Sequence, residues 1–117
     1  PRMAPAGVDV LLAGHVHLWQ QLSFRGDFPS QFITGFSGTQ EDMVPIPARL
    51  PPGTQPAPGA EVAAFSSWVD GFGYMTMKRA GGRSWRVEVH DVAGRVVNRC
   101  RSKGPESVCD VPSVDRR

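Results

Sequence analysis

The 117-residue sequence has only two cysteines and one tyrosine, and it contains no long apolar run. A helix that crosses a bilayer needs about 20 consecutive apolar residues, so the sequence predicts no membrane span. The first residues, PRMAPAG, also lack the basic and apolar regions of a signal peptide. A hydrophobic content of 40% is sufficient for the core of one small domain, and a second domain is not expected.

The net charge is also small, at +2, but the charges are unevenly distributed. Ten of the 13 Lys and Arg residues lie between Lys78 and Arg117, together with five of the 11 acidic residues. A basic surface of this kind can bind an acidic partner. Charges that alternate with apolar residues along strands, however, usually form the solvated face of a sheet. The second interpretation is favoured, and nucleic acid is not an expected partner.

Cys100 and Cys109 lie near each other in RCRSKGPESVCD and could close a short loop as a disulfide. Their spacing does not match the close pairs of a structural zinc site, and the chain has no further cysteine to complete one. A disulfide would indicate an oxidising compartment, whereas two thiols would fit a cytosolic protein. The sequence leaves both open and favours the disulfide, and with it a periplasmic or secreted protein.

Short apolar or alternating segments predict a chain made mostly of β-strands, with no helix of definite length. The run VDVLLA is rich in branched residues and is typical of a strand buried on both faces. The last three segments are separated by glycine-containing turns and predict an antiparallel meander. The six predicted strand segments are 8–13, 18–24, 31–36, 72–79, 84–91 and 96–101.

The meander has a predicted inner and outer face, because neighbouring side chains of a strand point to opposite sides. Met75 and Met77 are expected to share a face with Trp85 and the valines that alternate with it, while His90 points outward as a surface histidine. A proline-rich loop is predicted at 42–62, where six prolines exclude a regular element.

The predicted buried strand ends in GHVH, which places His15 and His17 two residues apart. Imidazole nitrogens are good ligands for Zn, Mn and Fe, and a tight turn after a strand can direct both rings into one cleft. Gly14 favours such a turn because it has no side chain. The alternative is that both are ordinary loop histidines. The spacing by itself does not separate the two interpretations.

The stretch DVLLAGHVHLWQ resembles the last signature of the calcineurin-like metallophosphoesterases, a superfamily that includes purple acid phosphatases. The resemblance continues through QLSF, QFITGFSGT, FGYMTMKR and WRVEVHDVAGRVV, and so covers most of the chain except the proline-rich loop. The family fold is α/β, a four-layer αββα sandwich. The resemblance implies that 1–117 is the C-terminal portion of one such domain, mostly β, which contributes the G-H-x-H strand end and the C-terminal antiparallel strands.

The resemblance further implies two divalent or trivalent metal ions, Mn, Fe or Zn, with His15 on one ion and His17 on the other. The substrate would be a phosphate mono- or diester. In purple acid phosphatases the signature continues into Tyr-Glu-Arg, whereas this chain has Trp19, Gln20 and Gln21, and the simplest role of Trp19 is packing.

In the family, the other metal signatures all precede G-H-x-H. None of them is found in the residues before Gly14. Asp9 does not replace them, because it lies in the predicted strand several residues before the histidines. The chain is therefore expected to be a catalytically incomplete fragment whose partner is the upstream part of the same domain. Two alternatives remain. One is a non-catalytic β-rich interaction module with a basic face, and the other is a domain that keeps the fold but has lost its chemistry.

Overall fold

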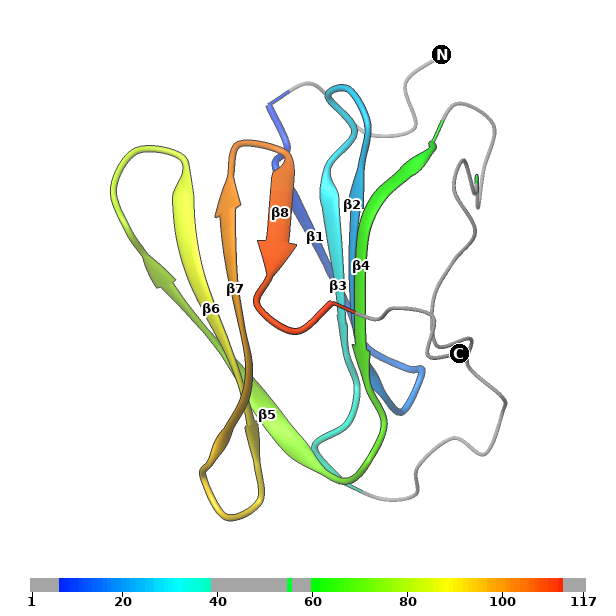
Figure 1. The fold of residues 1–117 in the computed structure, drawn as a ribbon, viewed down its shortest axis with the longest axis vertical. Coiled ribbons are helices and arrows are strands. Elements are labelled where there is room, and N and C mark those ends of the chain that lie inside the picture. Colours follow the sequence, from blue (N-terminus) through cyan, green and yellow to red (C-terminus); the bar gives the residue numbers. More distant parts are fainter. Residues whose placement is uncertain (1–6, 39–54, 56–59, 113–117) are drawn as a thin grey trace.

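The computed structural model describes residues 7–38, 55 and 60–112, which form two four-stranded β-sheets packed face to face (Figure 1). The described residues include no helix, and hence no helix that could cross a membrane. The predicted mostly β character is confirmed. The strands are β1 (Val10–Ala13), β2 (Trp19–Phe24), β3 (Ser30–Thr34), β4 (Val62–Trp68), β5 (Gly73–Arg79), β6 (Ser84–Asp91), β7 (Val96–Lys103) and β8 (Glu106–Cys109).

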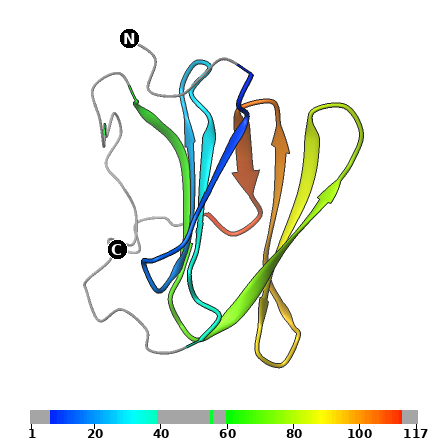
Figure 2. The ribbon, with the colours of Figure 1, turned by 180° about the vertical axis from the view of Figure 1, so that it is seen from behind.

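Sheet A contains β1 to β4 in the order β1-β3-β2-β4. β2 pairs antiparallel with both β3 and β4, whereas β1 runs parallel to β3 and forms one edge of the sheet (Figure 2). The strand β3 is thus inserted between β1 and β2. Because β1 and β3 are parallel, their carboxyl ends lie at the same end of the sheet, and this is the end at which GHVH leaves β1.

Sheet B contains β5 to β8 in sequence order, and every neighbouring pair is antiparallel. The predicted meander is confirmed, and β6 has the predicted bounds. The register places Met75 opposite Val89 and Met77 opposite Val87, so the predicted apolar face is also confirmed. Arg86 is exposed on the opposite face. The short edge strand β8 was not predicted from the sequence.

The main core lies between the two sheets. Trp19 and Phe32 of sheet A are fully buried, with ring centroids 6.4 Å apart, and they belong to the same apolar cluster as Val87 and Val89 of sheet B. Trp19 Nε1 also donates a hydrogen bond to Met75 Sδ at 3.2 Å. Full burial of a side chain of this size contributes roughly 1.5–3 kcal/mol, and this layer therefore holds the two sheets together.

A buried polar layer adjoins this core and connects β8 to sheet A. Gln21 Nε2 donates to Ser107 Oγ at 2.8 Å, and the backbone N–H of Ser107 donates to Ser23 Oγ at 3.0 Å. Ser30 Oγ lies 2.8 Å from Ser107 Oγ. A buried polar group that loses its partner costs about 1–3 kcal/mol, so these bonds fix the position of β8 over β2 and β3.

Strand β1 is more exposed than its sequence predicts. The run Val8–Ala13 is typical of a strand covered on both faces, but Leu11 is 38% exposed and Leu12 is 59% exposed. Among the described strands β1 pairs only with β3. The prediction of burial was therefore wrong for this part of the chain. An apolar composition indicates that a strand favours burial, but it does not determine which elements cover the strand.

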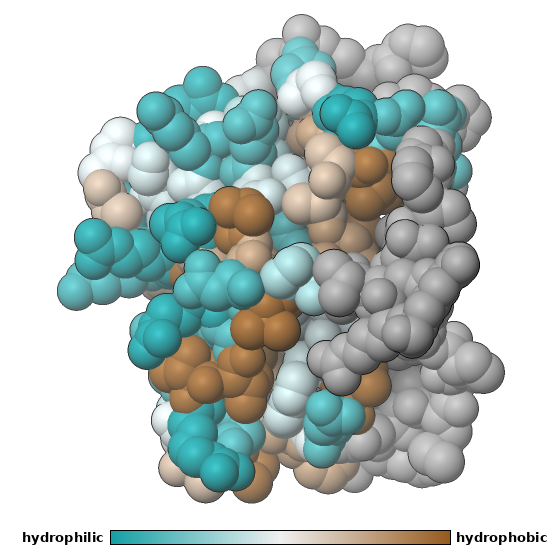
Figure 3. All heavy atoms as spheres, viewed as in Figure 1, coloured by the Kyte–Doolittle hydropathy of each residue, from teal (hydrophilic) through white to brown (hydrophobic). Residues whose placement is uncertain are grey.

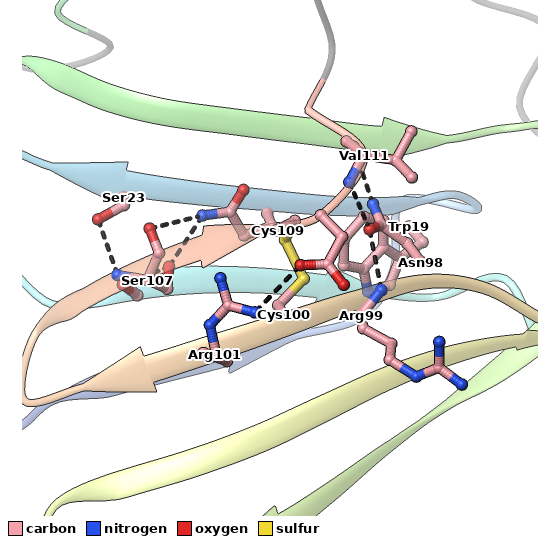
Figure 4. The surroundings of a disulfide bond; sticks show 12 residues. Trp19, Ser23, Asn98, Arg99, Cys100, Arg101, Ser107, Cys109 and Val111 are labelled. Atoms are coloured by element: carbon pink, nitrogen blue, oxygen red, sulfur yellow. Dashed lines mark hydrogen bonds and ion pairs between the residues drawn. A yellow bond between two sulfur atoms is a disulfide. The ribbon is translucent and has the colours of Figure 1, made fainter.

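A disulfide joins Cys100 and Cys109, which lie directly opposite each other on β7 and β8. Their Cα atoms are 3.9 Å apart, slightly below the usual range of roughly 4.4–6.8 Å. Both residues are buried on the inner face of sheet B, and Trp19 lies beside them (Figure 4). The bond that the sequence favoured is thus present, and it fastens the edge strand β8 to β7 within the core.

Most of the predicted proline-rich loop at 42–62 lies outside the described residues. Of this range the structure describes Gln55 and residues 60–62, and β4 begins at Val62. Strand β4 was not predicted. Its Phe65 packs with Leu22 and Phe24 in a second apolar cluster, on the face of sheet A that points away from sheet B. Both faces of β2 therefore carry buried side chains.

Candidate metal-binding turn

The sequence GHVH forms a tight turn between the end of β1 and the start of β2. The backbone N–H of Val16 donates to the carbonyl of Gly14, and that of Leu18 donates to the carbonyl of Val16, each at 2.9 Å. Hydrogen bonds between residues two apart fold the chain into successive three-residue turns. The turn follows the carboxyl end of β1, at the end of sheet A where the parallel strand β3 also ends.

Within this turn His15 has a strained backbone. Its φ angle is +73°, and among the described residues it is the only non-glycine residue with a positive φ. The left-handed conformation costs a residue with a side chain roughly 1–3 kcal/mol and persists only where the surrounding structure imposes it. Such strain is concentrated at active sites and ligand sites. The observation therefore makes the turn a candidate site independently of its sequence.

The two histidines differ in exposure: His15 is exposed, and His17 is half-buried. The turn that carries them is anchored on both sides, by the pairing of β1 with β3 and by Trp19, which begins β2 and is fully buried in the core. The packing role expected of Trp19 is confirmed. A common direction of the two imidazole rings stays a prediction.

The glycine that shapes the turn is Gly35, which follows β3, and it was not singled out from the sequence. Its backbone N–H donates to the carbonyl of Leu18 at 3.1 Å. A Cβ atom at Gly35 would lie 2.3 Å from the carbonyl oxygen of Val16. By contrast, a Cβ at Gly14 would meet nothing within 4 Å, and Gly14 does not have a positive φ. The predicted role of Gly14 was therefore wrong, and the close approach occurs at Gly35.

Replacing Gly35 by alanine is expected to displace the turn, because the added methyl group would overlap the backbone of Val16. Overpacking of this kind is expected to lower the free energy of unfolding by about 1–3 kcal/mol. Urea titration measures this change. The NMR signals of the His15 and His17 rings should shift in the same variant. Gly38→Ala is the matched control, because a Cβ there meets nothing within 4 Å. Equal stability and unchanged histidine signals in both variants would contradict this account.

Asp9, the acidic residue nearest to the turn in the sequence, is engaged elsewhere. Its carboxylate accepts hydrogen bonds from the Arg83 guanidinium, which lies in the turn between β5 and β6. The hydrogen bond from Arg83 holds the pKa of Asp9 below its usual value, with a smaller Coulombic contribution from the same side chain and against the opposing effect of burial. Asp9 directly precedes β1 and therefore connects the start of this strand to sheet B. That Asp9 is not a ligand at the turn stays a prediction.

The third histidine, His90, lies on the outer face of sheet B, as predicted. Its ring stacks on that of Tyr74, with centroids 4.6 Å apart and planes inclined by 7°. Its Nε2 lies 3.5 Å from Glu88 Oε1. His90 is therefore part of the exposed sheet surface, although its neighbours cover most of the ring.

His15 and His17 are suitable metal ligands by type, but two side chains do not make a complete set of ligands. Imidazole suits Zn, Mn and Fe, but a stable site takes at least three protein ligands. Among the described residues, no group of three or more His, Cys, Asp or Glu side chains could hold a metal ion. No protein-family model, curated protein or solved structure matches the chain.

Proposed function

We propose that the chain is the C-terminal part of a calcineurin-like metallophosphoesterase domain, and that the turn containing His15 and His17 is its contribution to a two-metal site. The observation that carries the proposal is the strained His15, held at the carboxyl end of β1 by the close approach of Gly35. Backbone strain of this kind is concentrated at active sites and ligand sites. The sequence motif and the backbone geometry thus favour the same residues.

The exposed apolar edge of sheet A supports an upstream partner within the same domain. Parallel strands are usually buried on both faces, and an exposed apolar edge strand is a ready template for pairing. Leu11 and Leu12 leave apolar surface on both faces of β1. We infer that an upstream strand pairs with β1 and that upstream helices cover the exposed outer face of sheet A at β1. This arrangement supplies the further layers of the αββα sandwich.

In the proposed site His15 would hold one ion and His17 the other, with the remaining ligands provided by the upstream part. When bound, such a pair of ions supplies a nucleophile from water and stabilises negative charge on a phosphoryl group. The chain's own contribution is positional. The buried Trp19 and the close approach of Gly35 to Val16 fix the backbone that carries the two imidazoles, so that this backbone is already in place when the metal binds.

The experiment that tests the proposal compares the chain with a protein extended upstream by a metallophosphoesterase N-terminal part. The extended protein is expected to hydrolyse para-nitrophenyl phosphate when Mn or Zn is added and to lose this activity when the metal is chelated. The 117-residue chain is expected to be inactive under both conditions, because two imidazoles retain a divalent ion only weakly. Turnover by the chain without the extension would contradict the proposal, as would an extended protein that chelation does not affect.

A further inference from the structure

The outer face of sheet B carries a row of like charges. The register aligns Lys78 of β5 with Arg86 of β6, and Arg86 with Arg101 of β7. All three side chains are exposed, and Lys103 follows two residues further along β7. Like charges directly opposite each other destabilise a sheet. The fold therefore tolerates an arrangement that is unfavourable for its own stability.

Only part of this charge is neutralised within the described chain. Arg101 Nη1 pairs with Asp110 Oδ1 at 3.1 Å, and the neighbouring Arg99 is likewise paired with a glutamate of β6. Within the ranges that the structure describes, no carboxylate lies within ion-pair distance of Lys78, Arg86 or Lys103, and Glu106 is the acidic residue opposite Lys103 in the register. These three cations, called here the free cations, lie on three consecutive strands.

A groove runs across this face beside the free cations. It has a volume of about 420 Å³, and a second groove of about 330 Å³ adjoins it at Arg86 and Arg101. Val108 is 48% exposed and lines the first groove together with Ala80. Figure 3 shows hydrophilic residues gathered over the part of the molecule that contains β6 to β8, with some hydrophobic residues between them. The surface thus combines unpaired positive charge with local apolar contact.

We propose that the outer face of sheet B binds an acidic peptide segment of a partner protein, with the Arg86 guanidinium at the centre of the contact. Arg presents a planar set of donors that can bind a carboxylate through two parallel hydrogen bonds. Lys78 and Lys103 flank Arg86 and would pair with neighbouring carboxylates. Val108 and Ala80 provide contact for apolar side chains of the same segment.

The distribution of the other residues favours a peptide over a nucleic acid. Glu88, Glu106 and Asp110 lie on the same face and interrupt its positive charge, so a ligand with spaced carboxylates fits this face better than a continuous phosphate backbone does. Single-stranded nucleic acids also need exposed aromatic rings on which bases stack. Tyr74 is four residues from Lys78 along β5 and is already stacked on His90. Trp85 contributes to the lining of the first groove, but it alternates with Arg86 along β6 and so belongs to the inner face. The inference is independent of the proposed phosphoesterase function, because it uses the opposite sheet.

The test measures binding of a fluorescein-labelled peptide of alternating Glu and Ala residues to the chain by fluorescence anisotropy at low salt. The variant combines Lys78→Gln, Arg86→Gln and Lys103→Gln. Its affinity is expected to fall about tenfold, since it loses three surface ion pairs. The control combines Arg25→Gln, Arg79→Gln and Arg95→Gln, which removes the same charge from residues that line neither groove, and should change the affinity less than about twofold.

Three results would overturn the proposal. The first is equal binding of a peptide in which Gln replaces Glu, because the contact would then not depend on charge. The second is an equal loss of affinity in the two triple variants, because net charge alone would then explain the binding. The third is tighter binding of a ten-nucleotide single-stranded DNA than of the acidic peptide, which would assign the surface to nucleic acid.

Discussion

Replacement of His15 or His17 by alanine is expected to lower the phosphoesterase activity of the upstream-extended protein by roughly 100-fold or more. Each substitution removes one ligand from one ion, and a two-metal mechanism needs both ions in place. The loss should appear mainly in kcat at saturating Mn or Zn, because the ions take part in the chemical step. Hydrolysis of para-nitrophenyl phosphate measures the effect, and metal content measured in parallel should fall by about one ion per protein.

The matched control for both variants is His90→Ala. His90 is the third histidine of the chain, and its ring lies on the outer face of sheet B, stacked on Tyr74, so its replacement should leave kcat within about twofold of the parent. Full activity in the His15 and His17 variants would show that GHVH is an ordinary loop sequence. An extended protein that is correctly folded, binds metal and has no activity would instead support a domain that has lost its chemistry.

Opening the disulfide between Cys100 and Cys109 is expected to lower the unfolding free energy by roughly 2–4 kcal/mol. The bond constrains the unfolded chain, and in the folded state it connects two cysteines that are 1% and 5% exposed. The edge strand β8 has only four residues, so it has few other bonds to β7. Urea unfolding with and without a reductant measures the difference.

The control is the double variant Cys100→Ala and Cys109→Ala, whose unfolding should not respond to the reductant. It should also be less stable than the oxidised parent. Identical unfolding curves for the oxidised and reduced parent would contradict the stabilising role of the bond. Because such a bond persists in oxidising compartments, a large effect would agree with the periplasmic or secreted location that the sequence favours.

The part of the fold that could be predicted from the sequence is the part that local patterns specify. In β5 to β7 apolar and polar side chains alternate, and glycine turns separate the strands, so the faces could be predicted, together with the bounds of β6 and, to within two residues, those of β5 and β7. In β4 the polar residues Ser66 and Ser67 are consecutive, although Ser66 is buried between the sheets. The alternation of apolar and polar residues is therefore broken, and the strand was not predicted. Strand β8 is too short for a pattern to be visible, and its position depends on distant partners such as Gln21.

The candidate site, like the fold, could be predicted from the sequence only in part. His15 and His17 could be selected from the sequence because imidazoles two residues apart after an apolar strand are a recognisable ligand pattern. The role of Gly35 could not, because the contact with Val16 arises only when β3 pairs beside β1. The positive φ of His15 accompanies the hydrogen bond from the Val16 N–H to the Gly14 carbonyl, which closes the turn around His15. The sequence indicates which groups could act, and the tertiary structure determines how the backbone presents them.

The arrangement of the main core also has a consequence for protein synthesis. Trp19 and Phe32 are covered by side chains of sheet B, and Met75, the hydrogen-bond partner of Trp19, lies 56 residues after it. At about 5–20 residues per second, a ribosome needs roughly 3–11 s to make the intervening chain. During this interval the inner face of sheet A has no cover and is prone to aggregate, whereas the hairpins of sheet B can form locally as they emerge. We therefore expect chaperones that act on the nascent chain to bind the segment around Trp19 and Phe32 first.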